Sequence, residues 1–253
     1  MNHLLKLIYR RPVRKASYEI LLGRMIERGR PEKGRFLRDD VDAILQETWR
    51  NVDAMLPAAE LEKLPTLGNR HNVFLAVLTV AGYHAYLSAG IEREYAIELF
   101  ADVGWKLYSK AALLPRFVAR VMTRDLQKQL EIMLRLLMIF PFSAPGRPAY
   151  EVKAWAEADH FCTYWTHCPP HAFVRKYVER NGDRGELEAF RRSWCWYDWA
   201  IAEVMVGGQR REGYYQRPHT MSQGDDVCDM CWYARRPQED GKPVENGQCP
   251  TAR

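Results

Sequence analysis

The residues that could do chemistry gather in the C-terminal half of the chain. Cysteine, histidine and aspartate side chains act as nucleophiles, proton carriers and metal ligands. Five of the six cysteines fall between positions 162 and 231. The candidates, in chain order, are Cys162, His167, Cys168, Cys195, Asp198, His219, Asp226, Cys228, Asp229 and Cys231. Such a set is compatible with nucleophilic catalysis, with a metal site or with a redox pair.

Two of these cysteines are candidates for a thiolate nucleophile. Cys168 follows His167 and precedes two prolines that suit the start of a helix, where the helix dipole favours an anion. Cys228 stands beside Asp229 in a predicted strand. Because neighbouring side chains on a strand point to opposite faces, only one of Cys228 and Asp229 is expected to face a pocket directly.

Other polar residues could support such a nucleophile. Cys195 and Asp198 are three positions apart in a predicted helix and therefore share a face. We expect Asp198 to orient a substrate and His219 to carry protons. A substrate carboxylate needs a cation, and Arg217 is our candidate, with Arg175 and Arg235 as alternatives that the sequence does not separate.

A structural role is the alternative reading for each cysteine. Free cysteine often behaves as a small buried apolar residue, and the aromatic neighbours of Cys195 favour packing there. Asp225 and Asp226 suit a turn. Asp198 needs a partner if it is buried among the tryptophans around it.

Metal binding and redox chemistry are rival interpretations. Cys228 and Cys231 have the spacing of a zinc knuckle, but five residues separate Cys162 from Cys168, where a second pair would have two to four. A scattered site that includes Cys168, Cys195 and Cys228 stays open. A redox Cys-x-x-Cys pair is disfavoured because it should open a helix. We expect no metal and no cofactor.

The order of three motifs resembles the L-2-amino-thiazoline-4-carboxylic acid hydrolase family. The motifs are "THCPPHAF", "CWYD" and "RPHTMSQGDDVCDMCWY", and the resemblance spans about residues 72–233. The family more often has an aromatic residue directly after Cys-Asp, whereas Met230 and Cys231 intervene here. The matched residues are Cys168 with Pro169, Cys195 with Asp198, and Gly224, Cys228 and Asp229.

This resemblance implies hydrolytic opening of a small cyclic amidine, such as a 2-aminothiazoline carboxylate. A carboxylate can hold the protonated amidine through two charge-assisted hydrogen bonds, and Asp198 and Asp229 are the candidates. The expected catalytic residues are Cys168, Cys228, Asp198 and His219, and the expected substrate-binding residues are Asp229, Cys195, His167 and Arg217. The alternative is a sensor module that binds a small molecule or a metal without catalysis, similar to domains of the vinyl-reductase type.

Composition limits the class of protein. The chain has 253 residues, of which 47% are hydrophobic, so it can fill a substantial core. The net charge of +5 is spread along the chain without a long basic block or a groove-reading motif, so we do not expect a nucleic-acid partner. Six cysteines are too few for a disulfide-rich secreted scaffold, and the N-terminus lacks the pattern of a signal peptide. We expect a cytoplasmic protein with reduced thiols and a small-molecule substrate; a homodimer is left open.

Two apolar stretches approach the length of a membrane span. Residues 73–91 carry a histidine, two tyrosines and two glycines, and residues 130–142 are too short and hold Arg135. We predict buried helices for both and no membrane partner.

The hydrophobic pattern predicts an α+β fold. Residues 17–140 have helical spacing, with a helix at 39–56 and another at 72–89. The prolines and glycine of residues 141–150 end this pattern. Beyond them we predict a strand or bent strand pair, a helix from Pro170 to Gly182, one helix closed by Gly207 and Gly208, and two strands joined near Gly224. We therefore predict a helical region at 1–145, packed against a C-terminal antiparallel sheet with two helices at 146–237, and a flexible tail at 238–253.

Overall fold

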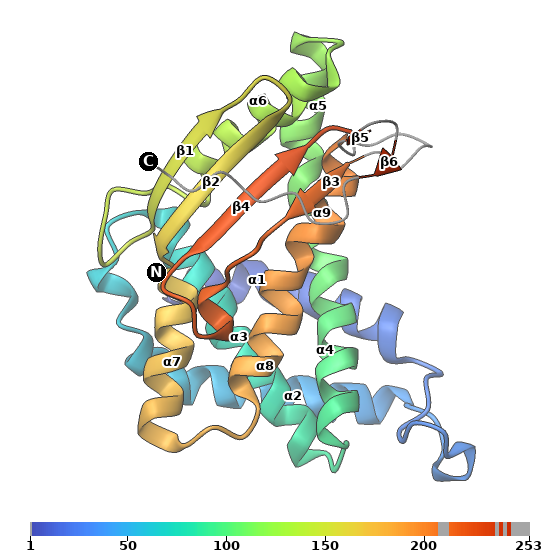
Figure 1. The fold of residues 1–253 in the computed structure, drawn as a ribbon. Helices are drawn as coiled ribbons and strands as arrows, with labels where there is room; N and C mark the ends of the chain where they lie inside the picture. The colour runs from blue at the N-terminus through green and yellow to red at the C-terminus, as the bar shows by residue number, and fades with distance from the viewer. Residues whose placement is uncertain (1, 207–212, 236–237, 240–241, 244–253) are drawn as a thin grey trace. The chain divides into compact units, whose positions relative to one another are not determined.

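The fold is α+β, as the sequence predicts. A computed structural model describes residues 2–206, 213–235, 238–239 and 242–243. Helices dominate the first half of the chain, and an antiparallel four-stranded sheet lies in the second half (Figure 1).

The chain divides into two compact units. The helical unit contains the described residues of 1–64, 70–108 and 170–195, and the sheet unit contains those of 65–69, 109–169 and 196–253. The sequence predicts a single boundary at residue 145, whereas each of these two units is built from several separate segments of the chain.

The helical unit is built on long amphipathic and buried helices. Its short 3-10 turns are η1 (Pro31–Lys33), η2 (Leu56–Ala59) and η3 (Leu61–Lys63). Its helices are α1 (Asn2–Leu21), α2 (Arg38–Met55), most of α3 (Leu67–Ser88), α4 (Arg93–Tyr108), most of α7 (Pro169–Asn181), α8 (Glu186–Phe190) and the π-helical segment η5 (Arg191–Cys195).

Two helices of this unit illustrate how the sequence specifies it. The carboxylate of Asp40 accepts the backbone N–H of Leu37 at 2.8 Å, which caps the start of α2. The residues of α2 at spacings of three and four, including Val41, Ile44 and Val52, are buried as predicted. α3 is apolar on nearly every side because it lies in the centre of the unit's core.

In the described part of the chain, no helix has the length and apolar character needed to cross a membrane. The stretch at residues 73–91 is largely buried, as expected. The stretch at residues 130–142 is helical up to Ile139 but only partly buried, since Leu130, Met133 and Leu134 are buried whereas Ile139 and Phe140 are exposed.

The strands of the sheet unit's main sheet are β1 (Glu151–Ala156), β2 (His160–His167), β3 (Tyr214–Gln216) and β4 (Cys228–Tyr233). They are antiparallel and lie in the order β1-β2-β4-β3. The helical elements of this unit are η4 (Ser109–Ala112), α5 (Leu113–Met122), α6 (Leu126–Ile139), α9 (Trp196–Val206) and the η6 turn (Met221–Gln223). Figure 1 shows α5 and α6 behind the strands. A further pair, β5 (Gln238–Glu239) and β6 (Lys242–Pro243), forms a separate two-stranded sheet.

The two faces of the sheet have different surroundings. One face, which we call the helix-covered face, packs on α6 and α9: the guanidinium of Arg135 lies 5.3 Å from the ring of Phe161, and the rings of Trp199 and Tyr215 are 4.8 Å apart. On the opposite face, the buried cluster consists of Cys162, Cys231 and Tyr233, with Trp155 and Tyr214 packed against it.

The structure differs from the prediction at two elements. The predicted single helix before Gly207 is interrupted by η5, where the Ser193 hydroxyl donates to the carbonyl of Ala189 at 2.7 Å and competes for a helical acceptor. The first of the two predicted C-terminal strands is only three residues long. Its remainder forms a loop and the η6 turn, because backbone N–H groups there bind side chains instead of a neighbouring strand.

Candidate active site

The site is organised by the loop of residues 217–223, which is the first part of the connection from β3 to β4. It lies at the end of the sheet where β4 begins and β2 ends, since these strands are antiparallel. Three consecutive backbone N–H groups of the loop donate to side chains of the following segment. The donors and acceptors are His219 to Asp229 Oδ1 at 2.7 Å, Thr220 to Asp225 Oδ2 at 2.7 Å, and Met221 to Cys228 Sγ at 3.2 Å.

His219 and Asp229 form a hydrogen-bonded dyad. Nδ1 of His219 lies 2.7 Å from Oδ2 of Asp229, and 54% of the histidine side chain is exposed while Asp229 is buried. The hydrogen bond and the negative charge of Asp229 raise the pKa of His219 above its ordinary value. Because Nδ1 donates to the carboxylate, Nε2 is the nitrogen that can exchange protons with a bound molecule.

Cys228 begins β4 on the helix-covered face. Its side chain is buried, with 6% exposed, and its sulfur accepts the N–H of Met221. Asp229 pairs with Tyr164 and points to the opposite face, so the predicted separation of Cys228 and Asp229 across the strand is confirmed.

Asp198 has an arginine partner. Its Oδ2 lies 3.0 Å from Nη1 of Arg217 and 3.5 Å from the hydroxyl of Tyr215. Only 2% of the Arg217 side chain is exposed, and its guanidinium lies 4.5 Å from the ring of Trp199. Burial raises the pKa of Asp198 to about 6, against the opposing effects of Arg217 and Tyr215. A substrate amidinium that binds Oδ2 of Asp198 would compete with Arg217 for it.

The remaining predicted site residues come from other elements: His167 ends β2, and Cys168 directly precedes α7. Cys168 is half-buried and is not disulfide-bonded, and the first two residues of α7 are prolines, which have no backbone N–H. His167 Nδ1 donates to the carbonyl of Ala149 at 2.6 Å. Cys195 ends η5 in the helical unit, where it packs against the apolar core.

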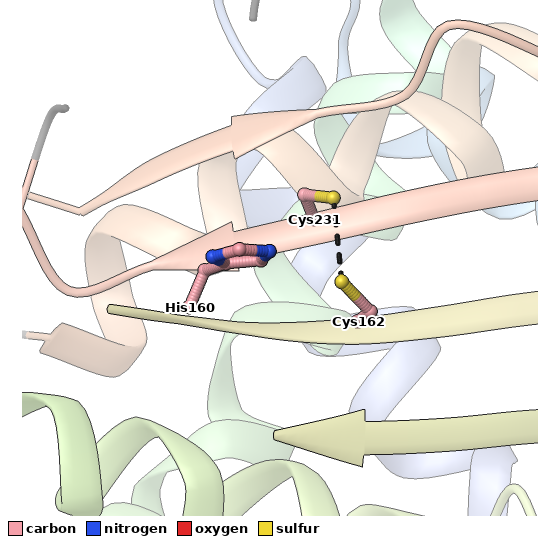
Figure 2. Close-up of side chains that lie close together, drawn as sticks. All are labelled: His160, Cys162 and Cys231. Carbon is pink, nitrogen blue, oxygen red and sulfur yellow. Dashed lines mark hydrogen bonds between the residues drawn. The ribbon is translucent and has the colours of Figure 1, made fainter. Parts of the chain in front are cut away.

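Sequence reasoning missed a second cluster in the sheet unit, formed by His160, Cys162 and Cys231. Figure 2 shows the three side chains pointing toward one another on neighbouring strands. The sulfur atoms of Cys162 and Cys231 are 3.6 Å apart, and one ligand atom from each residue of the cluster lies within 4.8 Å of the other two. Burial raises the pKa of the Cys162 thiol to about 12.

The cluster revises two expectations about the cysteines. Cys231 is disulfide-bonded, so the expectation of reduced thiols is wrong for this residue, while Cys162, Cys168, Cys195 and Cys228 are free. Cys228 and Cys231 are three apart in a strand and point to opposite faces, so the Cys-x-x-Cys spacing does not bring their sulfur atoms together. Cys162 and Cys231 face each other on neighbouring strands because of the strand register, which the spacing of cysteines within one strand does not reveal.

Comparison of the chain with protein-family models, with curated proteins and with solved structures gives no match.

Proposed function

We propose that this chain is a hydrolase that opens a small cyclic amidine, of the 2-aminothiazoline carboxylate kind, by a cysteine-dependent mechanism. The order of its motifs, which resembles the L-2-amino-thiazoline-4-carboxylic acid hydrolase family, supports the substrate class. The observation that carries the proposal is the loop of residues 217–223, which binds the side chains of both groups: its residue His219 is hydrogen-bonded to Asp229, and the N–H of its Met221 donates to the sulfur of Cys228. Nucleophile and proton carrier are the two groups that this reaction needs.

In the first half of the reaction, the Cys228 thiolate attacks the amidinium carbon of the protonated ring. A carbon–sulfur bond to Cys228 forms, and the ring carbon–sulfur bond breaks. The ring sulfur leaves with a proton from Nε2 of His219. An isothiourea attached to Cys228 remains.

In the second half, a water molecule attacks the same carbon. Neutral His219 accepts a proton from this water, and Cys228 leaves as thiolate. The product is a carbamoyl-cysteine, which equals the neutral ring plus one water molecule, and the proton that the ring carried as an amidinium passes to solvent. Asp229 stabilises the imidazolium that donates its proton in the first half and forms again in the second, because its two oxygens bind the side chain and the backbone N–H of His219.

Arg217 is the candidate partner of the substrate carboxylate. Its guanidinium is held by Asp198 and by the ring of Trp199, so it is already oriented before a ligand binds. In this proposal Asp198 positions Arg217, which differs from the expectation that Asp198 contacts the substrate directly.

Turnover of 2-aminothiazoline-4-carboxylate, followed by mass spectrometry of the ring-opened product, tests the proposal. We expect product from the native chain and none from Cys228→Ala. His219→Gln should reduce kcat by about 10²–10⁴-fold, the usual effect of removing a general acid–base group. Cys162→Ser, which removes a thiol from the opposite face of the sheet, is the matched control. Full activity of Cys228→Ala, Cys168→Ala and Asp198→Ala together would refute a cysteine-dependent site.

The second candidate function is a binding module without catalysis. The cluster of His160, Cys162 and Cys231 favours it, because two sulfur atoms and one imidazole match the donors that zinc prefers. The disulfide of Cys231 must be reduced before its sulfur can act as a ligand. This candidate predicts about one zinc per chain after reduction, stoichiometric ligand binding and no product.

A further inference from the structure

The helical unit contains a pocket that the proposed hydrolase site does not use. Its volume is about 470 Å³, which falls within the usual range for small-molecule sites. Every lining residue belongs to the helical unit. The walls come from α2 and η2 (Asn51, Ala54, Met55 and Ala58), from α3 (His84) and from α7 (Phe173, Lys176, Tyr177, Arg180 and Asn181).

His84 lines this pocket, and its side chain is hydrogen-bonded to Glu186. Glu186 is fully buried, and its Oε1 lies 2.7 Å from Nε2 of His84. Its second oxygen accepts the backbone N–H of Arg184 at 2.6 Å. Burial raises the pKa of Glu186, but these hydrogen bonds outweigh it and lower the pKa to about 2.

The ionised Glu186 determines what His84 offers a ligand. A carboxylate acceptor places a proton on Nε2, so Nδ1 is a hydrogen-bond acceptor whenever the ring is uncharged. Within the described residues, Nδ1 of His84 makes no hydrogen bond. A ligand with an O–H or N–H group would satisfy it.

Two residues that line the pocket carry a charge, Lys176 and Arg180, and both are cations. Lys176 and Arg180 are one turn apart on α7, and no carboxylate is among the lining residues. Lys176 is paired with Glu60 at 2.8 Å, whereas Arg180 has no ion pair in the described part of the chain. Arg180 is therefore the uncompensated charge of the pocket.

The rest of the lining is apolar or aromatic. The rings of Phe173 and Tyr177 are 6.3 Å apart, and the ring of Tyr177 is 5.9 Å from that of His84. Met55 and the two alanines add aliphatic surface. Flat apolar molecules fit such walls.

We propose that this pocket binds a small aromatic carboxylate that also carries a hydrogen-bond donor. The carboxylate pairs with Arg180 and Lys176, the ring packs on Phe173 and Tyr177, and the donor binds Nδ1 of His84. This site is separate from the cysteine site, so the failure of either proposal leaves the other untouched.

Binding of 4-hydroxybenzoate to the full chain, followed by NMR chemical-shift titration, tests the proposal. The probe has the three features the pocket selects, whereas 4-hydroxybenzamide lacks the charge and benzoate lacks the donor. We expect saturable binding of 4-hydroxybenzoate with a Kd near ~1 mM, as suits a ligand of this size. The two controls should bind about ten-fold more weakly, because each loses one charged or hydrogen-bonded contact.

Variants locate the binding site. Arg180→Gln changes an exposed residue and should weaken binding of 4-hydroxybenzoate about ten-fold, since it removes a charge-assisted contact. Arg50→Gln is the matched control, because Arg50 is an exposed arginine of α2 that does not line the pocket. Absence of saturable binding, equal binding of 4-hydroxybenzamide, or equal effects of Arg180→Gln and Arg50→Gln would overturn the proposal.

Discussion

Both carboxylate oxygens of Asp229 are bound by a single residue, His219. One oxygen lies 2.7 Å from Nδ1 of the ring, and the other accepts the backbone N–H at the same distance. The two bonds fix the histidine's position and the tautomer of its ring together. Asp229 therefore orients His219, and Nε2 is left for exchange with a bound molecule.

The first prediction concerns the pKa of His219. The raised pKa depends on Asp229, so Asp229→Asn should lower it toward the ordinary histidine value of about 6.5. NMR titration of the imidazole signals measures this pKa directly. Asp226→Asn is the control, and it should leave the titration of His219 nearly unchanged. An unaltered His219 titration in Asp229→Asn would contradict the role assigned to the dyad.

The second prediction is the pH dependence of turnover. His219 must be neutral to accept a proton from water, and its pKa is raised. As pH falls through this raised pKa, the ring becomes protonated and kcat should fall. The acid limb should move to lower pH in Asp229→Asn, because the pKa of His219 decreases. A pH–rate profile of both proteins checks the shift, and superimposable acid limbs would exclude His219 as the base.

The third prediction concerns the pair of Asp198 and Arg217. Arg217 is almost wholly buried, so Asp198→Asn removes the carboxylate that lies 3.0 Å from its guanidinium and should cost about 3–5 kcal/mol of unfolding free energy. The double variant Asp198→Asn with Arg217→Met should regain most of this loss, since the buried charge is gone. Urea unfolding of the single and double variants measures both effects. Additive losses would show that the pair is not coupled.

The fourth prediction is an acid-dependent loss of stability through Glu186. Its pKa in the folded chain is about 2, below the value of an ordinary glutamate. The stability that it contributes is therefore present above the ordinary pKa and lost as pH falls through about 4 toward 2. Glu186→Gln should lower stability at neutral pH and flatten the pH dependence in that window. Chemical denaturation at a series of pH values gives the comparison, and parallel curves would contradict the prediction.

Local sequence patterns predicted the elements whose folding depends on neighbours in the chain. The spacing of Val41, Ile44 and Val52 predicted α2, and the alternation of a strand predicted that Cys228 and Asp229 would face opposite sides. Capping by Asp40 and the helix start near Pro170 are also local signals.

Contacts between distant parts of the chain could not be predicted in this way. His84 and Glu186 are 102 positions apart, and Cys162 and Cys231 are 69 apart. No pattern within a helix or a strand links such residues, because their pairing depends on packing and on strand register. The partner of Asp198 was missed for the same reason, although its need for a partner was predicted.

The most direct test of cysteine-dependent hydrolysis is to identify the residue that carries the intermediate. The native chain is mixed with 2-aminothiazoline-4-carboxylate, quenched with acid within the first turnover, and digested for peptide mass spectrometry. The account predicts a ring-opened adduct on the peptide that contains Cys228 and none in Cys228→Ala. Product formation with no adduct on Cys228, or an adduct on Cys168 instead, would contradict the assignment of Cys228 as nucleophile.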